Sequence, residues 1–304
     1  MSTFSHILLI GATGSIGSVV LEALQKDPGA TLTLLQRATS KSTLPAHLRT
    51  IRIADSYPTE ELVEAFRGQD VVLNFMTTLS VSGQYRMIDA AISAGVRRYV
   101  PSEYGLNNMR PDAQALSQVF HDKGKVQEYL RAKATDGAIE WMSISSGMWL
   151  EWSMKHGFLG MHAPERRFVF WDDGEGLFSC TTEENTALGL IEALKKPAET
   201  KNTNIFLSDF AVSQKQLLEV IERVHGVTYT TETIDSHALI KEKTEAGRNG
   251  DYLANFALLE TGFVTGRYGG YLEKEGEIWN KRLGLPKKSL DEVIEAALKS
   301  MGEI

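Results

Sequence analysis

Short apolar runs that alternate with helical patterns dominate the first half of this chain of 304 residues. The runs have the length of buried parallel strands, and the residues between them recur at the three- and four-residue spacing of helices that pack on a sheet. The runs lie at residues 7–10, 32–35, 51–53, 71–75, 98–100 and 141–144. This alternation predicts an α/β fold with a doubly wound parallel sheet and right-handed crossovers that cover both faces.

Composition limits the possible partners. The chain is 42% hydrophobic, which is enough apolar material for a sizeable core. Its 39 acidic residues outnumber its 32 basic ones, so it has no basic field that would bind nucleic acid. The single Cys180 and the scattered histidines exclude a disulfide framework and Cys-based zinc spacings, and we expect no metal. The run at residues 7–10 is too short for a signal peptide or a membrane span. We therefore expect a cytoplasmic protein without a membrane partner, either a monomer or a homodimer.

The pattern changes after about residue 150. We expect residues 1–150 to form a dinucleotide-binding domain and residues 151–304 to form a smaller mixed α/β lobe that binds substrate. Some segments of the second part are free to return to the first sheet. The two parts are expected to share a cleft.

Turn and helix-cap signals predict several elements of the second half of the chain. Asp173-Gly174 separates two apolar runs and predicts a hairpin, with Phe168, Phe170 and Trp171 in its core. Capping boxes predict two further helix starts. The boxes pair Ser213 with Gln216 and Ser289 with Glu292.

The first strand leads directly into the glycine-rich loop Gly11-Ala12-Thr13-Gly14-Ser15-Ile16-Gly17, and a helical pattern follows. Here Gly11 permits the tight turn, Gly14 lets the backbone approach a pyrophosphate, and Gly17 lets the helix pack close to the strand. The pyrophosphate would bind free N–H groups at the helix start. The sequence therefore predicts a dinucleotide site of the Rossmann type, to which Thr13, Ser15 and Ile16 also contribute.

The end of the second strand distinguishes the two dinucleotides. A site for NAD(H) places a carboxylate there, whereas this chain has Leu35-Gln36-Arg37. Arg37, helped by Lys41 or Ser42, can bind the 2′-phosphate of NADP(H) through charge-assisted hydrogen bonds. We expect NADP(H); the alternative is that Arg37 is a solvated loop charge.

Two later loops follow strand ends, where ligands of such sheets bind. The residues expected to line the nicotinamide half of the site are Met76, Thr77, Pro101, Ser102 and Glu103. Other interpretations remain open: Asn74 can be a buried structural amide, and Ser102 and Glu103 can bond to neighbouring backbone.

Two lysines compete for a catalytic role. Tyr129 and Lys133 have the YxxxK spacing of ordinary short-chain dehydrogenases. A crossover helix runs away from the carboxyl edge of the sheet, however, so the ten residues from Lys123 to Lys133 carry the chain roughly 15 Å from the cofactor. Lys123, near the helix start, is therefore the candidate, and Lys125 should point elsewhere.

The position four residues before Lys123 is Val119, so the usual hydroxyl partner is missing. Lys123 would act alone or through a water. The alternatives are a ribose-binding or a solvated lysine. His121 can relay a proton or be a solvated residue.

Aromatic and apolar residues follow the sixth strand. They can form an apolar wall for a flat aromatic or polyketide-type substrate, or pack between the two lobes. The substrate candidates are Tyr104, Met148, Trp149, Trp152 and His156, with Phe158 beside them.

Several segments together resemble the NmrA-like, isoflavone-reductase-like branch of the atypical short-chain dehydrogenases, which includes phenylcoumaran benzylic ether and pinoresinol-lariciresinol reductases. The segments are residues 11–17, Arg37, Gln84, residues 97–105 (RRYVPSEYG) and residues 120–126 (FHDKGKV). The match covers most of the chain and is strongest through about Ser153.

The resemblance implies that the glycine loop, Arg37 and Gln84 bind NADPH, that Lys123 is the catalytic lysine, and that the second lobe closes a cleft. It also suggests a fungal-type member that acts in secondary metabolism. The chain departs from the family at two places: Gln127-Glu128 replaces a basic pair, and residues 146–152 (SGMWLEW) replace the corresponding plant stretch, which changes the substrate pocket. Plant substrates are therefore not carried over.

The leading hypothesis is an NADPH-dependent reductase that transfers a hydride to a carbonyl or conjugated double bond of a small aromatic or polyketide-type metabolite. Lys123 would supply a proton or a positive field. The chief alternative is an NmrA-type redox-sensing regulator that binds the dinucleotide without turnover. A sugar-nucleotide epimerase is disfavoured by Val119, where a tyrosine would be needed.

Overall fold

The computed structural model describes residues 4–304. The chain divides into two compact units. The first comprises residues 4–103, 125–144 and 187–205, and the second comprises residues 104–124, 145–186 and 206–304. The first unit thus includes a segment from beyond residue 150.

Within the described residues, seven strands form one sheet in the order β11-β6-β5-β4-β1-β2-β3. They are β1 (His6–Ile10), β2 (Thr31–Arg37), β3 (Arg49–Ile53), β4 (Val71–Asn74), β5 (Arg98–Val100), β6 (Glu140–Ser145) and β11 (Thr203–Phe206). Neighbours from β3 through β1 and β4 to β6 pair in parallel. The six predicted strands and the doubly wound α/β class are confirmed.

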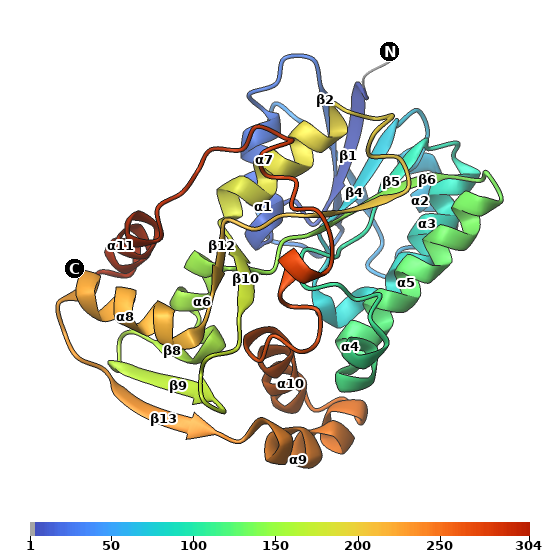
Figure 1. Ribbon diagram of the computed structural model, residues 1–304. Helices are drawn as coiled ribbons and strands as arrows, with labels where there is room; N and C mark the ends of the chain where they lie inside the picture. Colours follow the sequence, from blue (N-terminus) through green and yellow to red (C-terminus); the bar gives the residue numbers. More distant parts are fainter. Residues whose placement is uncertain (1–3) are drawn as a thin grey trace. The chain divides into compact units, whose positions relative to one another are not determined.

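Helices cover both faces of this sheet (Figure 1). On one face lie α2 (Thr59–Phe66), α3 (Gln84–Ser93) and α5 (Gln118–Thr135), and on the other lie α1 (Ser15–Leu24) and α7 (Glu183–Leu194). The short 3₁₀ segment η1 (Thr78–Gly83) precedes α3. Apolar side chains of α2, α3 and α5, such as Phe66, Met87 and Leu130, form one core with the strands. These helices therefore form because their apolar faces are buried on the sheet.

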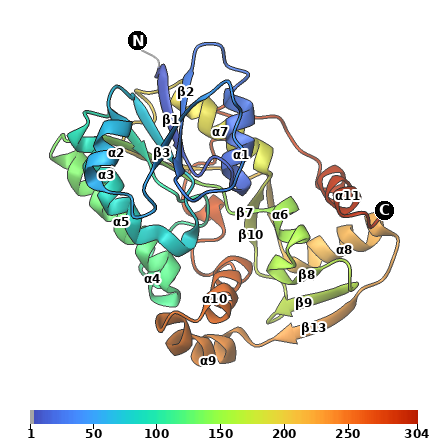
Figure 2. The same ribbon diagram turned by 180° about the vertical axis from the view of Figure 1, so that it is seen from behind.

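The described part of the second unit contains two three-stranded sheets, β12-β10-β7 and β13-β9-β8. Their strands are β7 (Met148–Trp149), β8 (Met161–His162), β9 (Arg167–Trp171), β10 (Phe178–Thr181), β12 (Phe210–Val212) and β13 (Thr230–Ile234). The helical elements are α4 (Pro111–Leu116), α6 (Leu150–Lys155), η2 (Phe158–Gly160), α8 (Gln214–His225), α9 (Ser236–Arg248), α10 (Tyr252–Val264), η3 (Leu272–Lys274) and α11 (Leu290–Met301). Helices α9 and α10 lie side by side, as do β9 and β13 (Figure 2).

The predicted hairpin at Asp173-Gly174 is wrong. The strands on either side of this turn belong to different sheets, because β9 pairs with β13 and β8 while β10 pairs with β12 and β7. Phe168 and Trp171 are nevertheless buried, in the core of the second unit, and Phe170 packs against that core.

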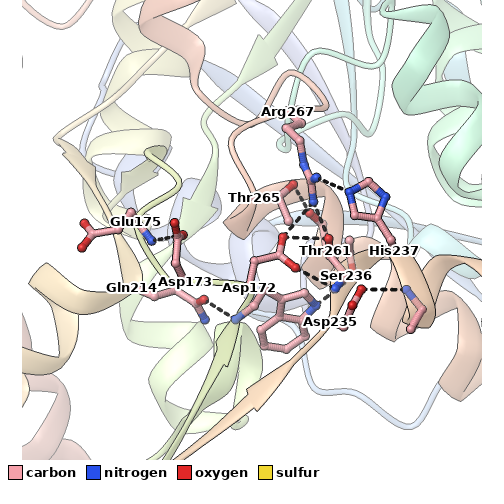
Figure 3. Close-up of polar contacts among 12 residues, drawn as sticks. Asp172, Asp173, Glu175, Gln214, Asp235, Ser236, His237, Thr261, Thr265 and Arg267 are labelled. Carbon is pink, nitrogen blue, oxygen red and sulfur yellow. Dashed lines mark hydrogen bonds and ion pairs between the residues drawn. The ribbon is translucent and has the colours of Figure 1, made fainter.

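Asp172 redirects the chain after β9. Its φ of +55° lies in the left-handed region, and its carboxylate accepts hydrogen bonds from the backbone N and the Oγ of Ser236, at 2.8 and 2.7 Å. Arg267 donates to the same carboxylate at 3.0 Å and to His237 Nε2 at 3.1 Å (Figure 3). These partners, distant in sequence, tie the end of β9 to the start of α9, which a local turn signal cannot reveal.

Both predicted capping boxes mark real helix starts. The Ser213 hydroxyl accepts from Gln216 N, and the Gln216 side chain accepts from Ser213 N, as the motif predicts. The Ser289 hydroxyl accepts from Glu292 N at the start of α11. Across residues 4–304, no helix combines the length and apolar character needed to cross a membrane.

Candidate active site

The predicted site residues are distributed over both units. The cofactor candidates in the first unit are Gly11, Thr13, Gly14, Ser15, Ile16, Gly17, Arg37, Lys41, Met76, Thr77, Gln84, Pro101, Ser102 and Glu103. The second unit holds Tyr104, Lys123, Met148, Trp149, Trp152 and His156. The boundary between the units falls within α5, after Gly124.

The three glycines of the loop differ in whether their positions leave room for a side chain. Gly11 has φ +78°, and a Cβ there would lie 2.7 Å from the carbonyl oxygen of Phe75. A Cβ on Gly17 would lie 2.3 Å from the carbonyl oxygen of Gly11. A Cβ on Gly14 would meet no atom nearer than 3.4 Å. The fold itself thus requires Gly11 and Gly17, while the surface above Gly14 is open to a close backbone approach.

The start of α1 suits a bound anion. Gly14 is the N-cap residue, no side chain caps the helix, and the first turn contains no acidic residue. Thr13, Gly14 and Ser15 are exposed. The uncapped N–H groups and the helix dipole both favour negative charge, so these residues fit the pyrophosphate of a dinucleotide.

Arg37 ends β2 and is exposed, as are Lys41 and Ser42 on the loop that follows. The Gln36 side chain donates to Ser40 Oγ at 3.2 Å and to the Ser42 carbonyl at 2.8 Å, which holds this loop in place. The end of β2 therefore presents a cation on an ordered loop, a suitable arrangement for a 2′-phosphate.

An acid that sequence reasoning missed lies close to Arg37. Asp55, just after β3, accepts hydrogen bonds from the side chain and the backbone N of Thr39, and the pKa of its carboxyl is lowered by these bonds and by the charge of Arg37. Its oxygens are thus engaged within the protein. The pairing of β2 with β3 brings Asp55 here, and no local spacing signals it.

The loops after β4 and β5 are bonded to each other. Ser102 Oγ donates to the Met76 carbonyl at 2.7 Å, and Ser102 N donates to Gln84 Oε1 at 2.9 Å. Gln84 is fully buried, which makes it a brace for these loops as well as a cofactor candidate. Glu103 accepts a hydrogen bond from Gln127 Nε2 at 2.8 Å.

Asn74 is a buried structural amide. Its Nδ2 donates to Tyr99 Oη at 2.7 Å, and its Oδ1 accepts from Met76 N at 2.8 Å. The structural interpretation of Asn74 is therefore confirmed. The same bonds hold the Met76 backbone at the carboxyl end of β4.

Lys123 lies near the start of α5 and is only 7% exposed, whereas Lys133 lies in the last turn. Lys133 Nζ lies 5.0 Å from the centre of the Tyr129 ring, and Tyr129 Oη donates to Asp89 Oδ1 at 2.5 Å. The predicted positions of the two lysines along the helix are confirmed, and Tyr129 of the YxxxK pair is bonded to Asp89 of α3. Val119, at the hydroxyl position of ordinary short-chain dehydrogenases, is a buried core residue.

The aromatic segment after β6 packs within the second unit. Met148 and Phe158 belong to its core, and Trp152 contacts Phe158 edge-on with ring centres 5.6 Å apart. His156 is exposed and stacks on Trp152 at 4.4 Å. Tyr104 is buried and has φ +48°. Trp149 and Trp152 are half-buried, so His156, stacked on Trp152, is the exposed member of these candidates.

A buried acid, Glu151, also escaped the sequence interpretation. Burial raises its pKa to about 7, and a hydrogen bond from the backbone N of Glu183 at the start of α7 opposes this rise. Its one sequence signal is an acidic residue inside the otherwise apolar stretch from Met148 to Trp152. Across residues 4–304, no cluster of three or more His, Cys, Asp or Glu side chains is placed to hold a metal.

Comparisons with known proteins identify the family of this chain and structures that share its fold. A profile of the NmrA-like family matches residues 3–275. Oxidoreductase aprR of Aspergillus flavus is 34% identical over 295 residues, which are 96% of this chain and 98% of that protein.

Two solved structures share the fold. A crystal structure of pinoresinol-lariciresinol and phenylcoumaran benzylic ether reductases superposes with a TM-score of 0.79 at 21% identity, over 96% of this chain and 99% of that one. The binary complex of leucoanthocyanidin reductase with NADPH from Vitis vinifera superposes with a TM-score of 0.78 at 15% identity, over 97% and 100% of the chains. From the extent of the profile match and the identity to the Aspergillus protein, the chain belongs to the NmrA-like family.

Proposed function

We propose that this chain is an NADPH-dependent reductase that acts on a carbonyl or conjugated double bond of a small aromatic or polyketide-type metabolite. The observation that carries the proposal is the uncapped start of α1 after the glycine loop, together with the exposed Arg37 at the end of β2. The name of the Aspergillus relative, an oxidoreductase, and the NADPH in the Vitis complex support it.

Each group has a distinct role. The N–H groups at the start of α1 bind the pyrophosphate, and Arg37 binds the 2′-phosphate. NADPH supplies the hydride when bound. Lys123 Nζ holds a proton and a positive charge for the substrate oxygen, where negative charge develops during reduction. The Trp152–His156 stack offers a flat apolar surface of the kind that aromatic substrates prefer.

Lys123→Ala tests the catalytic role. NADPH oxidation is measured against a panel of aromatic ketones, enones and benzylic ethers. We expect kcat to fall by about 10²- to 10⁴-fold, the usual contribution of a positioned proton donor, while the Kd for NADPH changes little.

Lys125→Ala is the matched control, because Lys125 lies on the same helix but its ammonium is bound to Glu128 at 2.8 Å. This variant should keep the activity of the unmodified protein. Equal losses in both variants would refute the role of Lys123. Tight NADPH binding without turnover on any compound would instead favour a redox-sensing regulator.

A further inference from the structure

A pocket of about 400 Å³ opens on the surface of the second unit, where α4 and the start of α5 meet α9 and α10, and Arg248 and Gln118 are exposed at it. This volume is within the usual range for small-molecule sites, roughly 300–1,000 Å³. Gln118 and His121 contribute from α5, and Thr244 and Arg248 contribute from α9. The cavity and Lys123 lie on different faces of α5. Lys123 follows His121 by two residues and therefore points about 200° away from it around the helix.

The lining itself carries a positive charge and no acid. Among the described residues that line it, Arg248 is a permanent cation and none is a carboxylate. Within residues 4–304, Arg248 forms no ion pair, so its guanidinium is available to a ligand. Asp122, the acid next to His121, lies outside the lining and accepts a hydrogen bond from Gln118 Nε2 at 2.7 Å.

The rest of the lining is apolar or supplies neutral amide and hydroxyl groups. Leu116 and Leu258 are buried side chains that form an apolar wall. The Gln114 amide is held by a hydrogen bond to the Asn108 carbonyl at 2.9 Å, which keeps it in a fixed position at the cavity. A guanidinium beside an apolar wall is complementary to a carboxylate attached to a flat apolar group.

We propose that this cavity binds a small organic carboxylate, with its anionic group on Arg248 and its apolar body against Leu116 and Leu258. The site is independent of the reductase proposal, because none of its lining residues belongs to the glycine loop, the end of β2 or the Lys123 face. It would make the second unit responsive to an acidic metabolite.

Binding of trans-cinnamate, followed by NMR chemical shifts of the full chain, tests the proposal. We expect saturable binding, with the shifts concentrated around Leu116 and Leu258. Arg248→Gln should weaken it tenfold or more through loss of the charge-assisted hydrogen bond. Thr244→Glu, which places a carboxylate in the lining, should abolish binding.

Two controls test whether binding depends on the charge of the ligand and on this site. Cinnamamide, which has the same apolar body without the charge, should bind at least tenfold more weakly than cinnamate. Lys241→Gln removes an exposed cation from α9 outside the cavity and should leave the affinity unchanged. Equal affinity for the amide, equal weakening by Lys241→Gln, shifts elsewhere in the chain, or no saturable binding would each overturn the proposal.

Discussion

Arg37 is the residue on which the choice between the two dinucleotides depends. It is exposed at the carboxyl end of β2, and the nearby Asp55 is held by Thr39. Arg37→Asp should shift the cofactor preference toward NADH by about 1–3 kcal/mol, the scale of a charged hydrogen bond. The ratio of kcat/KM for NADPH and NADH measures the shift. Arg49→Asp, at the opposite end of β3, is the control, and equal use of both cofactors by the unmodified protein would contradict the prediction.

Substitutions of two loop glycines should separate an effect on stability from an effect on NADPH binding. Gly17→Ala places a Cβ 2.3 Å from the Gly11 carbonyl oxygen and should destabilise the fold by about 1–3 kcal/mol, as overpacking does. Gly14→Ala has room within the protein and should leave the free energy of unfolding nearly unchanged while it weakens NADPH binding. Urea unfolding and a binding titration check both variants. A large stability loss in Gly14→Ala would contradict this division of roles.

At the scale of elements, the bonds at Asp172 attach α9 to β9 and β13. Ser236 is fully buried, so loss of the carboxylate leaves its N–H and hydroxyl with fewer partners. Asp172→Ala should lower the free energy of unfolding by about 1–3 kcal/mol. Asp172→Asn should cost less, because it keeps an acceptor and tolerates the left-handed backbone. Thermal unfolding compares the two with Asp173→Ala, and equal effects of all three would argue against the role of Asp172.

At the scale of the whole molecule, buried carboxyls make stability depend on pH. Burial raises the pKa of Glu260, which accepts a hydrogen bond from Leu159 N, from its usual 4.5 to about 7, and Glu151 shows the same rise. In the unfolded chain these groups lose their protons near pH 4.5, so the folded state binds more protons between that pH and about 7. The free energy of unfolding should therefore fall as pH rises through this window.

Urea unfolding at several pH values from 5 to 8 measures this slope. Glu260→Gln should flatten it, and Glu219→Gln, an exposed acid on α8, should not. A slope unchanged by Glu260→Gln would refute the assignment.

Asp112 acts in the opposite sense, because the hydrogen bond from Arg110 lowers its pKa. The stabilisation that ionised Asp112 contributes is fully present above the pKa that Asp112 has in the unfolded chain. It is lost as the pH falls through the lower pKa of the folded state.

The predictions that succeeded rest on neighbours along the chain. Apolar runs of strand length, the spacing of Gly11, Gly14 and Gly17, and the Ser213 cap are local patterns whose structural meaning is set by backbone geometry within a few residues. Lys123 lies near a helix start, as its place ten residues before Lys133 on the crossover helix predicts. Local patterns therefore predicted six of the seven strands of the first unit's sheet, the glycine loop and the order of the candidate residues along each element, but not β11.

Which distant residues meet depends on how the chain packs in three dimensions. The predicted hairpin is wrong because β9 pairs with β13 and β8 whereas β10 pairs with β12 and β7, and Asp172 bonds to Ser236, 64 residues away. The brace from Gln84 to Ser102, the acid Asp55 beside Arg37 and the buried Glu151 depend likewise on strand order and on burial, which also sets the pKa of a carboxyl. Such contacts form through three-dimensional packing, so no spacing along the chain encodes them.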